Sequence, residues 1–390
     1  MRFALYKGQS QYGSLRLHVD QLAAALTGLG HEAQIIDLMA ADAQAELGRA
    51  LADPPDCFFG FSGVGSDVQI EQVSAYDRLG SVYASLYVDH PVHHQQRLAT
   101  PIRKHVAFFL DRSHVQLMTA WPKGRGFAHL GFLPPGANEL AEPVDLSDET
   151  FARRDIPILF TGSYRGPPQA PWRAWEESPA RTIVEEVAGR MTADARLPIL
   201  EALKAVLTAL GSELTPQLLS DFLPLLQAPQ FFAEAYHRDA LLQTLGRAGV
   251  PLQIYGAGWE PLVERYPSFQ YGGVGSFEET LHLLRRARVV LNINNGFVAG
   301  GHERVFTAMC AGAAVFSDNT KYYADTFKEG REISTFAWPK MAEAPDLLGA
   351  LVADEARLAG IARAGARKAQ AEHRWSERAG RLVKAVKQVR

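Results

Sequence analysis

The chain has 390 residues, of which 47% are hydrophobic and 21% charged, and this composition is typical of an ordinary globular protein. It excludes a disordered or fibrous chain, and the length favours two domains that each bury a core. The formal net charge of −3 gives no reason to expect binding to nucleic acid or to an anionic membrane surface.

The chain opens directly with a short strand, which Lys7 and Gly8 end too early for the core of a signal peptide. No apolar run reaches the length that spans a bilayer. Both cysteines, Cys57 and Cys310, lie in apolar runs, which favours buried reduced thiols over a disulfide. We therefore expect a cytoplasmic protein without a transmembrane segment.

The N-terminal part predicts an open parallel α/β sheet. An amphipathic helix is expected over 15–29, where leucines and a valine recur at helical spacing. Polar residues gather where the predicted strands end, which is where open α/β sheets place their sites. The predicted strands are 3–6, 33–36, 57–61, 82–88, 106–109 and 128–132.

One of these strand ends carries Asp89, His90, His93 and His94. Imidazole and carboxylate groups could bind zinc or iron, but Pro91 interrupts the helix that would space two histidines as ligands. The sequence favours a general base or a sugar-binding cluster, since histidine titrates near neutral pH. The plain structural alternative, a solvated or capping histidine, fits His94 best. We therefore expect no metal site.

A linker rich in proline, glycine and acidic residues is expected over 134–154, followed by a strand at 156–160. Gly162 and Ser163 come directly after this strand. A glycine there lets the backbone approach an anion and a serine can donate to it, although an ordinary turn would look the same. An all-helical insertion follows over about 167–249, with helices predicted at 180–190, 197–210, 215–226 and 231–248.

The parallel pattern resumes with strands at 252–255 and 269–274. The first ends in the run Tyr255, Gly256, Ala257, Gly258 and Trp259. The acidic start of the helix after residue 276 is explained by the helix dipole alone.

The segment 291–319 is the most informative. A strand at 289–293 ends in Asn294, Asn295 and Gly296, and a helix then begins near His302 and closes at Gly312 before another strand. Free backbone N–H groups at such a helix start favour phosphate. The candidate residues here are Asn295, Gly301, His302, Glu303 and Arg304.

This segment resembles the C-terminal domain of GT-B glycosyltransferases, in particular a group-1-like, CgeB-like branch. In that family the helix reads roughly R-x-F-E-A-x-A-x-G, and the run from Arg304 to Gly312 reads RVFTAMCAG. The resemblance implies that the helix start lies under the diphosphate and ribose of a nucleotide sugar. The usual ribose-binding glutamate falls at Thr307, so Glu303, one turn earlier, is expected to take its place unless it merely caps the helix.

Two further runs resemble the same family. The run from Tyr255 to Trp259 matches a Y/F-G-x-G-W motif that lies beside the nucleotide base. The run from Glu372 to Arg378 matches an E-H-x-W-x-x-R motif before a final helix, which in this family crosses back onto the N-terminal domain. The resemblance is strong over the last third of the chain and architectural over the first half.

The resemblance implies a GT-B fold: two Rossmann-like doubly wound domains that face a cleft, with the helical insertion early in the second. The expected domains are an acceptor-side domain over 1–150, a nucleotide-sugar domain over 151–375 and a terminal helix over 376–390 that packs back on the first. The insertion could shape an acceptor site or an oligomer interface.

The expected function is transfer of a sugar from a nucleotide sugar to an unknown acceptor, without a cofactor and without a DXD motif to hold a metal. Arg304 is expected to stabilise the departing diphosphate, and Arg165 is a second candidate for the same role. The group that orients the acceptor is expected from Asp89, His90 or His93. The alternatives are a non-catalytic GT-B-like binding protein, which Thr307 favours, and another nucleotide-sugar enzyme of this fold such as an epimerase.

Overall fold

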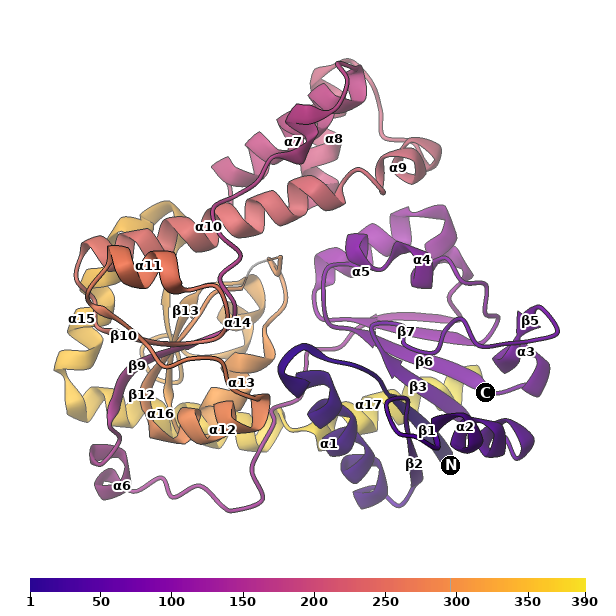
Figure 1. Ribbon diagram of the computed structural model, residues 1–390, viewed down its shortest axis with the longest axis horizontal. Helices are drawn as coiled ribbons and strands as arrows, with labels where there is room; N and C mark the ends of the chain where they lie inside the picture. Colours follow the sequence, from indigo (N-terminus) through magenta and orange to yellow (C-terminus); the bar gives the residue numbers. More distant parts are fainter. Residues whose placement is uncertain (295) are drawn as a thin grey trace. The chain divides into compact units, whose positions relative to one another are not determined.

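The computed structural model describes residues 1–294 and 296–390, which form two compact units (Figure 1). Unit 1 comprises Met1–Asn138, Thr215–Pro224 and His373–Arg390, and unit 2 comprises Glu139–Leu214 and Leu225–Glu372. Over the described residues, each unit contains one parallel sheet of six strands. The predicted α/β architecture with two doubly wound domains is therefore confirmed.

The sheet of unit 1 has the strand order β2-β1-β3-β6-β7-β8. Its strands are β1 (Arg2–Lys7), β2 (Glu32–Asp37), β3 (Cys57–Phe61), β6 (Val82–Tyr87), β7 (His105–Phe109) and β8 (His129–Phe132), with a short hairpin of β4 (Gln69–Ile70) and β5 (Val73–Ser74) beside it. The central strands β3, β6 and β7 are buried along their whole length, as parallel strands covered on both faces should be.

Two helices from opposite ends of the chain pack together on this sheet. They are α1 (Ser14–Gly28) and the terminal helix α17 (Trp375–Val389), which also contacts β6 and β7 (Figure 1). The buried residues of α17 recur at helical spacing, including Leu382 and Val386. The remaining helices of this unit are α2 (Ala43–Ala52), α3 (Ala75–Leu79), α4 (Gln95–Leu98), α5 (Arg112–Ala120) and α9 (Pro216–Phe222).

The residues of the E-H-x-W-x-x-R motif anchor the start of α17. Trp375 Nε1 donates to Asn138 Oδ1 at 3.1 Å, and Arg378 Nε donates to the Pro135 carbonyl at 3.1 Å. The indole also lies so close to Gly136 that a Cβ there would approach it to 2.4 Å. These contacts explain the motif as a structural anchor for the terminal helix.

The sheet of unit 2 has the order β11-β10-β9-β12-β13-β14. Its strands are β9 (Ile156–Thr161), β10 (Leu252–Tyr255), β11 (Phe269–Tyr271), β12 (Ala287–Asn292), β13 (Ala314–Asp318) and β14 (Ser334–Phe336). Its helices are α6 (Asp148–Ala152), α7 (Pro179–Ala193), α8 (Ile199–Ala209), α10 (Gln227–Arg247), α11 (Glu260–Arg265), α12 (Phe277–Arg286), α13 (Glu303–Cys310), α14 (Lys321–Thr326), α15 (Ala344–Ala353) and α16 (Glu355–Glu372).

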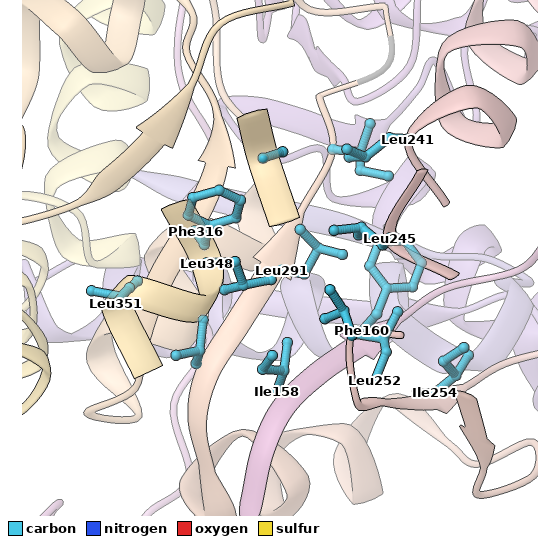
Figure 2. Close-up of a cluster of buried hydrophobic side chains, with 14 of the residues drawn as sticks. Ile158, Phe160, Leu241, Leu245, Leu252, Ile254, Leu291, Phe316, Leu348 and Leu351 are labelled. Carbon is cyan, nitrogen blue, oxygen red and sulfur yellow. The ribbon is translucent and has the colours of Figure 1, made fainter. Parts of the chain in front are cut away.

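The core of unit 2 joins the sheet to helices on one of its faces (Figure 2). Leu241 and Leu245 of α10 and Leu348 of α15 are fully buried against strand residues such as Leu252 and Leu291. Each such side chain contributes about 1.5–3 kcal/mol by leaving water. The second half of α10 is thereby fixed on the sheet.

The helices predicted for the insertion are present as α7, α8, α9 and α10. α7 packs on both α8 and α10 within unit 2 (Figure 1). The segment Thr215–Pro224, which contains α9, is grouped with unit 1 and hydrogen-bonds there, since Gln95 Nε2 donates to the Leu223 carbonyl at 2.8 Å.

Candidate functional site

The loop after β9 is fixed by the loop after the neighbouring strand β10. Gly162 N donates to the Tyr255 carbonyl and Tyr164 N to the Ala257 carbonyl, both at 2.9 Å. Trp259 Nε1 donates to the Gly162 carbonyl at 2.7 Å, and its side chain is fully buried. The backbone around Gly162 and Ser163 is therefore held in one conformation.

The two glycines of the Tyr255–Trp259 run are required by this close approach. Gly256 has φ +133° and a Cβ there would lie 2.2 Å from the Gly162 carbonyl oxygen. Gly258 has φ +82° and a Cβ there would lie 2.2 Å from the Tyr164 carbonyl oxygen. Only glycine fits both positions. The run therefore supports the loop after β9, whatever else its backbone contacts.

A buried polar network holds Asn294, just after β12, and His302, at the start of α13. Asp318 Oδ1, at the end of β13, accepts from Asn294 N at 2.7 Å and from Asn294 Nδ2 at 2.9 Å. Tyr323 OH donates to Asn294 Oδ1 at 2.8 Å and accepts from His302 N at 3.0 Å. Burial raises the pKa of Asp318, whereas these hydrogen bonds oppose the shift. The start of α13 is thereby connected to the end of β13.

His302 is the N-cap of α13, and its Nδ1 lies 3.2 Å from Arg304 N and 2.5 Å from Glu303 Oε2. If Nδ1 is neutral it accepts a hydrogen bond from Arg304 N, and if it is protonated it donates one to Glu303 Oε2. Glu303 is thus placed beside His302 in the first turn. Gly301 lets the chain pass Tyr323, because a Cβ there would lie 2.8 Å from that ring.

Arg304 reaches from α13 to the ends of the neighbouring strands β9 and β12. Its Nε donates to Thr161 Oγ1 at 3.2 Å and its Nη1 to Asn292 Oδ1 at 2.9 Å. A Cβ on Gly162 would lie 3.3 Å from Nη2, so the guanidinium lies directly against the glycine loop. Burial lowers the pKa of Arg304 because it disfavours the charged form, and Glu303 partly offsets this effect.

A second arginine, which the sequence reasoning missed, meets the same loop. Arg238 lies on α10, and its Nη1 donates to the Ser163 carbonyl at 2.9 Å. Burial and the charge of Arg304 together lower the pKa of Arg238 to about 10, although the charge of Glu234 opposes the shift. Two arginines of unit 2 are thus close enough to repel each other across one glycine loop. Arg165, in that loop, is exposed and lies over the Phe231 ring at 5.6 Å.

The remaining candidates of this unit are Thr307 and Asn295. Thr307 is 1% exposed, so the position that matches the family's glutamate points into the protein interior. Asn295 lies outside the described residues.

In unit 1, the structure brings His90, His93 and His114 together at the ends of β6 and β7. The His90 ring lies 4.4 Å from the His114 ring and 6.2 Å from the His93 ring, measured between centroids. His90 is buried, and its Nδ1 accepts from Val92 N at 3.3 Å. Asp89 is separate from these rings, with an exposed side chain that lies 3.4 Å from His94 Nε2.

The environment of His90 disfavours its charged form. Burial lowers its pKa well below the usual value, and the neighbouring His114, His93 and His94 add to the effect. Pro91 begins a short 3₁₀ turn over Pro91–His93, a position where its missing N–H is tolerated. In the described part of the chain, no group of three histidine, cysteine or carboxylate side chains is arranged to hold a metal ion.

Residues 238–384 match a protein-family model described as Glycosyl transferase-like. No curated protein matches the sequence. No helix of the described residues is long and apolar enough to cross a membrane.

Solved structures resemble the whole chain. Sucrose-phosphate synthase (tll1590) from Thermosynechococcus elongatus is 12% identical with a TM-score of 0.57, over 100% of this chain and 99% of that one. Anabaena Alr3699/HepE in complex with UDP-glucose is 10% identical with a TM-score of 0.55, over 99% and 100%. AviGT4, a glycosyltransferase involved in avilamycin A biosynthesis, is 17% identical with a TM-score of 0.51, over 100% and 98%.

At these identities the likeness shows the fold, which is the two-domain GT-B fold. The family match over residues 238–384, most of which belong to unit 2, and this fold together support a glycosyltransferase of the GT-B type. The narrower CgeB-like branch stays a prediction.

Proposed function

We propose that this protein is a cytoplasmic glycosyltransferase that takes a sugar from a nucleotide-sugar donor bound by unit 2. In this proposal the diphosphate contacts the Gly162–Ser163 loop, the N-terminus of α13 and the guanidinium groups of Arg238 and Arg304. The observation that carries it is the convergence of these two arginines on one glycine loop. UDP-glucose bound to the similarly folded HepE supports the class of donor.

The electrostatics favour an anion at this loop. Burial lowers the pKa of both arginines because it disfavours their charged forms. A diphosphate would compensate both charges and accept bidentate hydrogen bonds from them. As the glycosidic bond to the diphosphate breaks, negative charge develops on the leaving oxygens, and cations placed there in advance stabilise that state. In this proposal Glu303, which lies beside His302, accepts hydrogen bonds from the ribose hydroxyls, as the family resemblance implies.

We further propose that the acceptor is bound or oriented by the cluster at the end of β6. His90 favours its neutral form, so it is suited to accept a hydrogen bond from an acceptor hydroxyl and orient it. Asp89, being exposed, is suited to bind a polar acceptor.

A thermal-shift screen of nucleotide sugars, followed by a hydrolysis assay on any that bind, tests the proposal. A donor at a hundred times its Kd should stabilise the fold by about 2.7 kcal/mol. Stabilisation together with slow release of nucleotide diphosphate would support a transferase. The absence of stabilisation by every nucleotide sugar would refute it.

The second candidate function is nucleotide or partner binding without transfer. It is favoured by the burial of Thr307 at the position of the family's glutamate. Tight binding of a nucleotide sugar with no hydrolysis and no transfer to any sugar acceptor would select this candidate.

A further inference from the structure

The helix α10 brings a polar stripe to the proposed donor site. Gln230, Glu234 and Arg238 are spaced four residues apart, so they lie on one face of the helix. Arg238 contacts the loop after β9, as described above. The other two face a different loop of the same unit, the one that follows β12.

The contact of Glu234 with that loop is close. A Cβ on Gly296 would lie 2.6 Å from Glu234 Oε1 and 3.2 Å from Gln230 Nε2. Gln230 is itself buried, and its Nε2 donates to Glu234 Oε1 at 2.9 Å, which orients the carboxylate. Glu234 therefore lies beside Gly296 in the loop after β12, and it is close enough to Arg238 for its charge to raise the pKa of that arginine.

A carboxylate in this place has a defined chemical preference. It repels a phosphate or another carboxylate, but it accepts hydrogen bonds from hydroxyl groups and has acceptor sites for more than one of them. Hydrogen bonds to a charged group are also the stronger kind. The part of a nucleotide sugar that carries adjacent hydroxyls and no charge is either the ribose or the transferred sugar.

We propose that Glu234 binds hydroxyl groups of the donor and so selects an uncharged, hydroxylated group next to the diphosphate. This inference rests on the proposed function, because it places Glu234 beside a bound nucleotide sugar. It gives the inserted helix α10 a direct part in donor recognition, with Arg238 on the phosphates and Glu234 on the hydroxyls one helical turn away.

The test uses Glu234→Gln in the full chain and measures binding by calorimetry. Three probes separate the contacts: inorganic pyrophosphate, the nucleoside diphosphate that the wild type binds best among UDP, GDP and ADP, and its glucose derivative. The glutamine keeps the acceptor for Gln230 but loses the charge and one acceptor oxygen. Glu186→Gln, an exposed glutamate of α7, is the matched control.

We expect Glu234→Gln to weaken binding of the hydroxyl-bearing probe about ten- to a hundredfold, the range for hydrogen bonds to a charged group. Pyrophosphate should bind unchanged or more tightly, since a negative charge has been removed. Equal losses for the nucleoside diphosphate and the nucleotide sugar assign the contact to the ribose. A loss confined to the nucleotide sugar assigns it to the transferred sugar.

Two results would overturn the inference. If all three probes weaken in parallel, Glu234 only aligns Arg238; if none weakens, it does not touch the donor. If Glu234→Gln fails to fold, Glu234→Asp, which keeps the charge but retracts it, should show the same pattern with a smaller loss. A wild type that binds no nucleotide at all would refute the proposed function, and this inference with it.

Discussion

Replacing Arg238 and Arg304 by alanine, singly and together, tests the placement of the diphosphate most directly. Each guanidinium lies against the Gly162–Ser163 loop, and each is expected to donate to a phosphate oxygen. A charge-assisted hydrogen bond contributes about 1.5–3 kcal/mol, so each single variant should weaken nucleoside diphosphate binding about ten- to a hundredfold.

The double variant adds a second measurement. Because the charge of Arg304 lowers the pKa of Arg238, the two side chains interact before any ligand binds. The losses should therefore be non-additive by about 0.5–3 kcal/mol, as is usual for residues in contact. In the absence of ligand, each single variant also relieves repulsion between the two cations, which offsets part of the stability lost with the hydrogen bonds.

Isothermal titration calorimetry with folded variants measures these effects, with circular dichroism to confirm the fold. Arg247→Ala is the matched control, since Arg247 is an exposed arginine of the same helix that bonds to Gln243. Unchanged affinity in folded Arg238→Ala and Arg304→Ala would refute the placement of the diphosphate, and equal weakening by Arg247→Ala would show that the effect is not local.

Three further predictions concern stability and loop geometry. Burial lowers the pKa of His105 to about 3. Below pH 6.5 the unfolded chain therefore binds more protons than the folded chain, and the free energy of unfolding should fall by up to about 1.4 kcal/mol for each unit by which the pH is lowered. In urea titrations at pH 7 and 5, His105→Phe should make the free energy of unfolding less dependent on pH. Asp318→Asn should destabilise the fold by about 1–3 kcal/mol in the same assay, since the amide can accept both bonds from Asn294 on its oxygen but places an NH2 group where Oδ2 accepts from Trp338 Nε1; a smaller change would mean that the network rearranges. Gly256→Ala should abolish nucleotide binding, because its Cβ would collide with the loop after β9. Gly273→Ala is the control and should bind nucleotide normally, because Gly273 also has a positive φ, +94°, but has open space around it.

The sequence predicted the fold well where the hydrophobic pattern and the turn residues of a segment indicate the element that the segment forms in the structure. The strand at β12, the glycine-punctuated loop and the helix α13 were evident because apolar runs, turn residues and helical spacing follow each other in the order of a βαβ unit. Strand β14 was not predicted, since Ser334–Phe336 is too short to show any periodicity.

Of the candidate site, the sequence predicted the residues that directly follow β9 and those at the start of the helix that comes after β12. Gly162, Ser163 and Arg304 are close together in the structure, and the sequence expected this because carboxyl ends of parallel strands share one edge of the sheet. Arg238 was missed because it lies within a long helix that reads as core. A signal was nevertheless present, because α10 leads directly into β10. The end of α10 must therefore pack on the sheet near the start of β10. Residues two to three turns earlier in α10 then lie near the opposite edge of the sheet, which carries the candidate site.

Gly256 and Gly258 illustrate a different limit of sequence reasoning. The resemblance suggested a role beside the nucleotide base, and that role stays a prediction. The structure gives each glycine a sufficient reason of its own, since carbonyl oxygens of the neighbouring loop occupy the space of a side chain. A pattern of residues cannot distinguish space that is left for a ligand from space that is filled by the next strand's loop.

The course of the chain between the units has a consequence for protein synthesis. The chain passes from one unit to the other after Asn138, Leu214, Pro224 and Glu372, and α17, which packs on α1, β6 and β7, is made after the whole of unit 2. A nascent chain that has released all strands of unit 1 still lacks the helix that covers one face of that sheet. Domains usually complete folding in the order of their synthesis. Here unit 1 is begun before unit 2 and completed only after it, and until α17 is made the sheet face that it covers is exposed to other apolar surfaces.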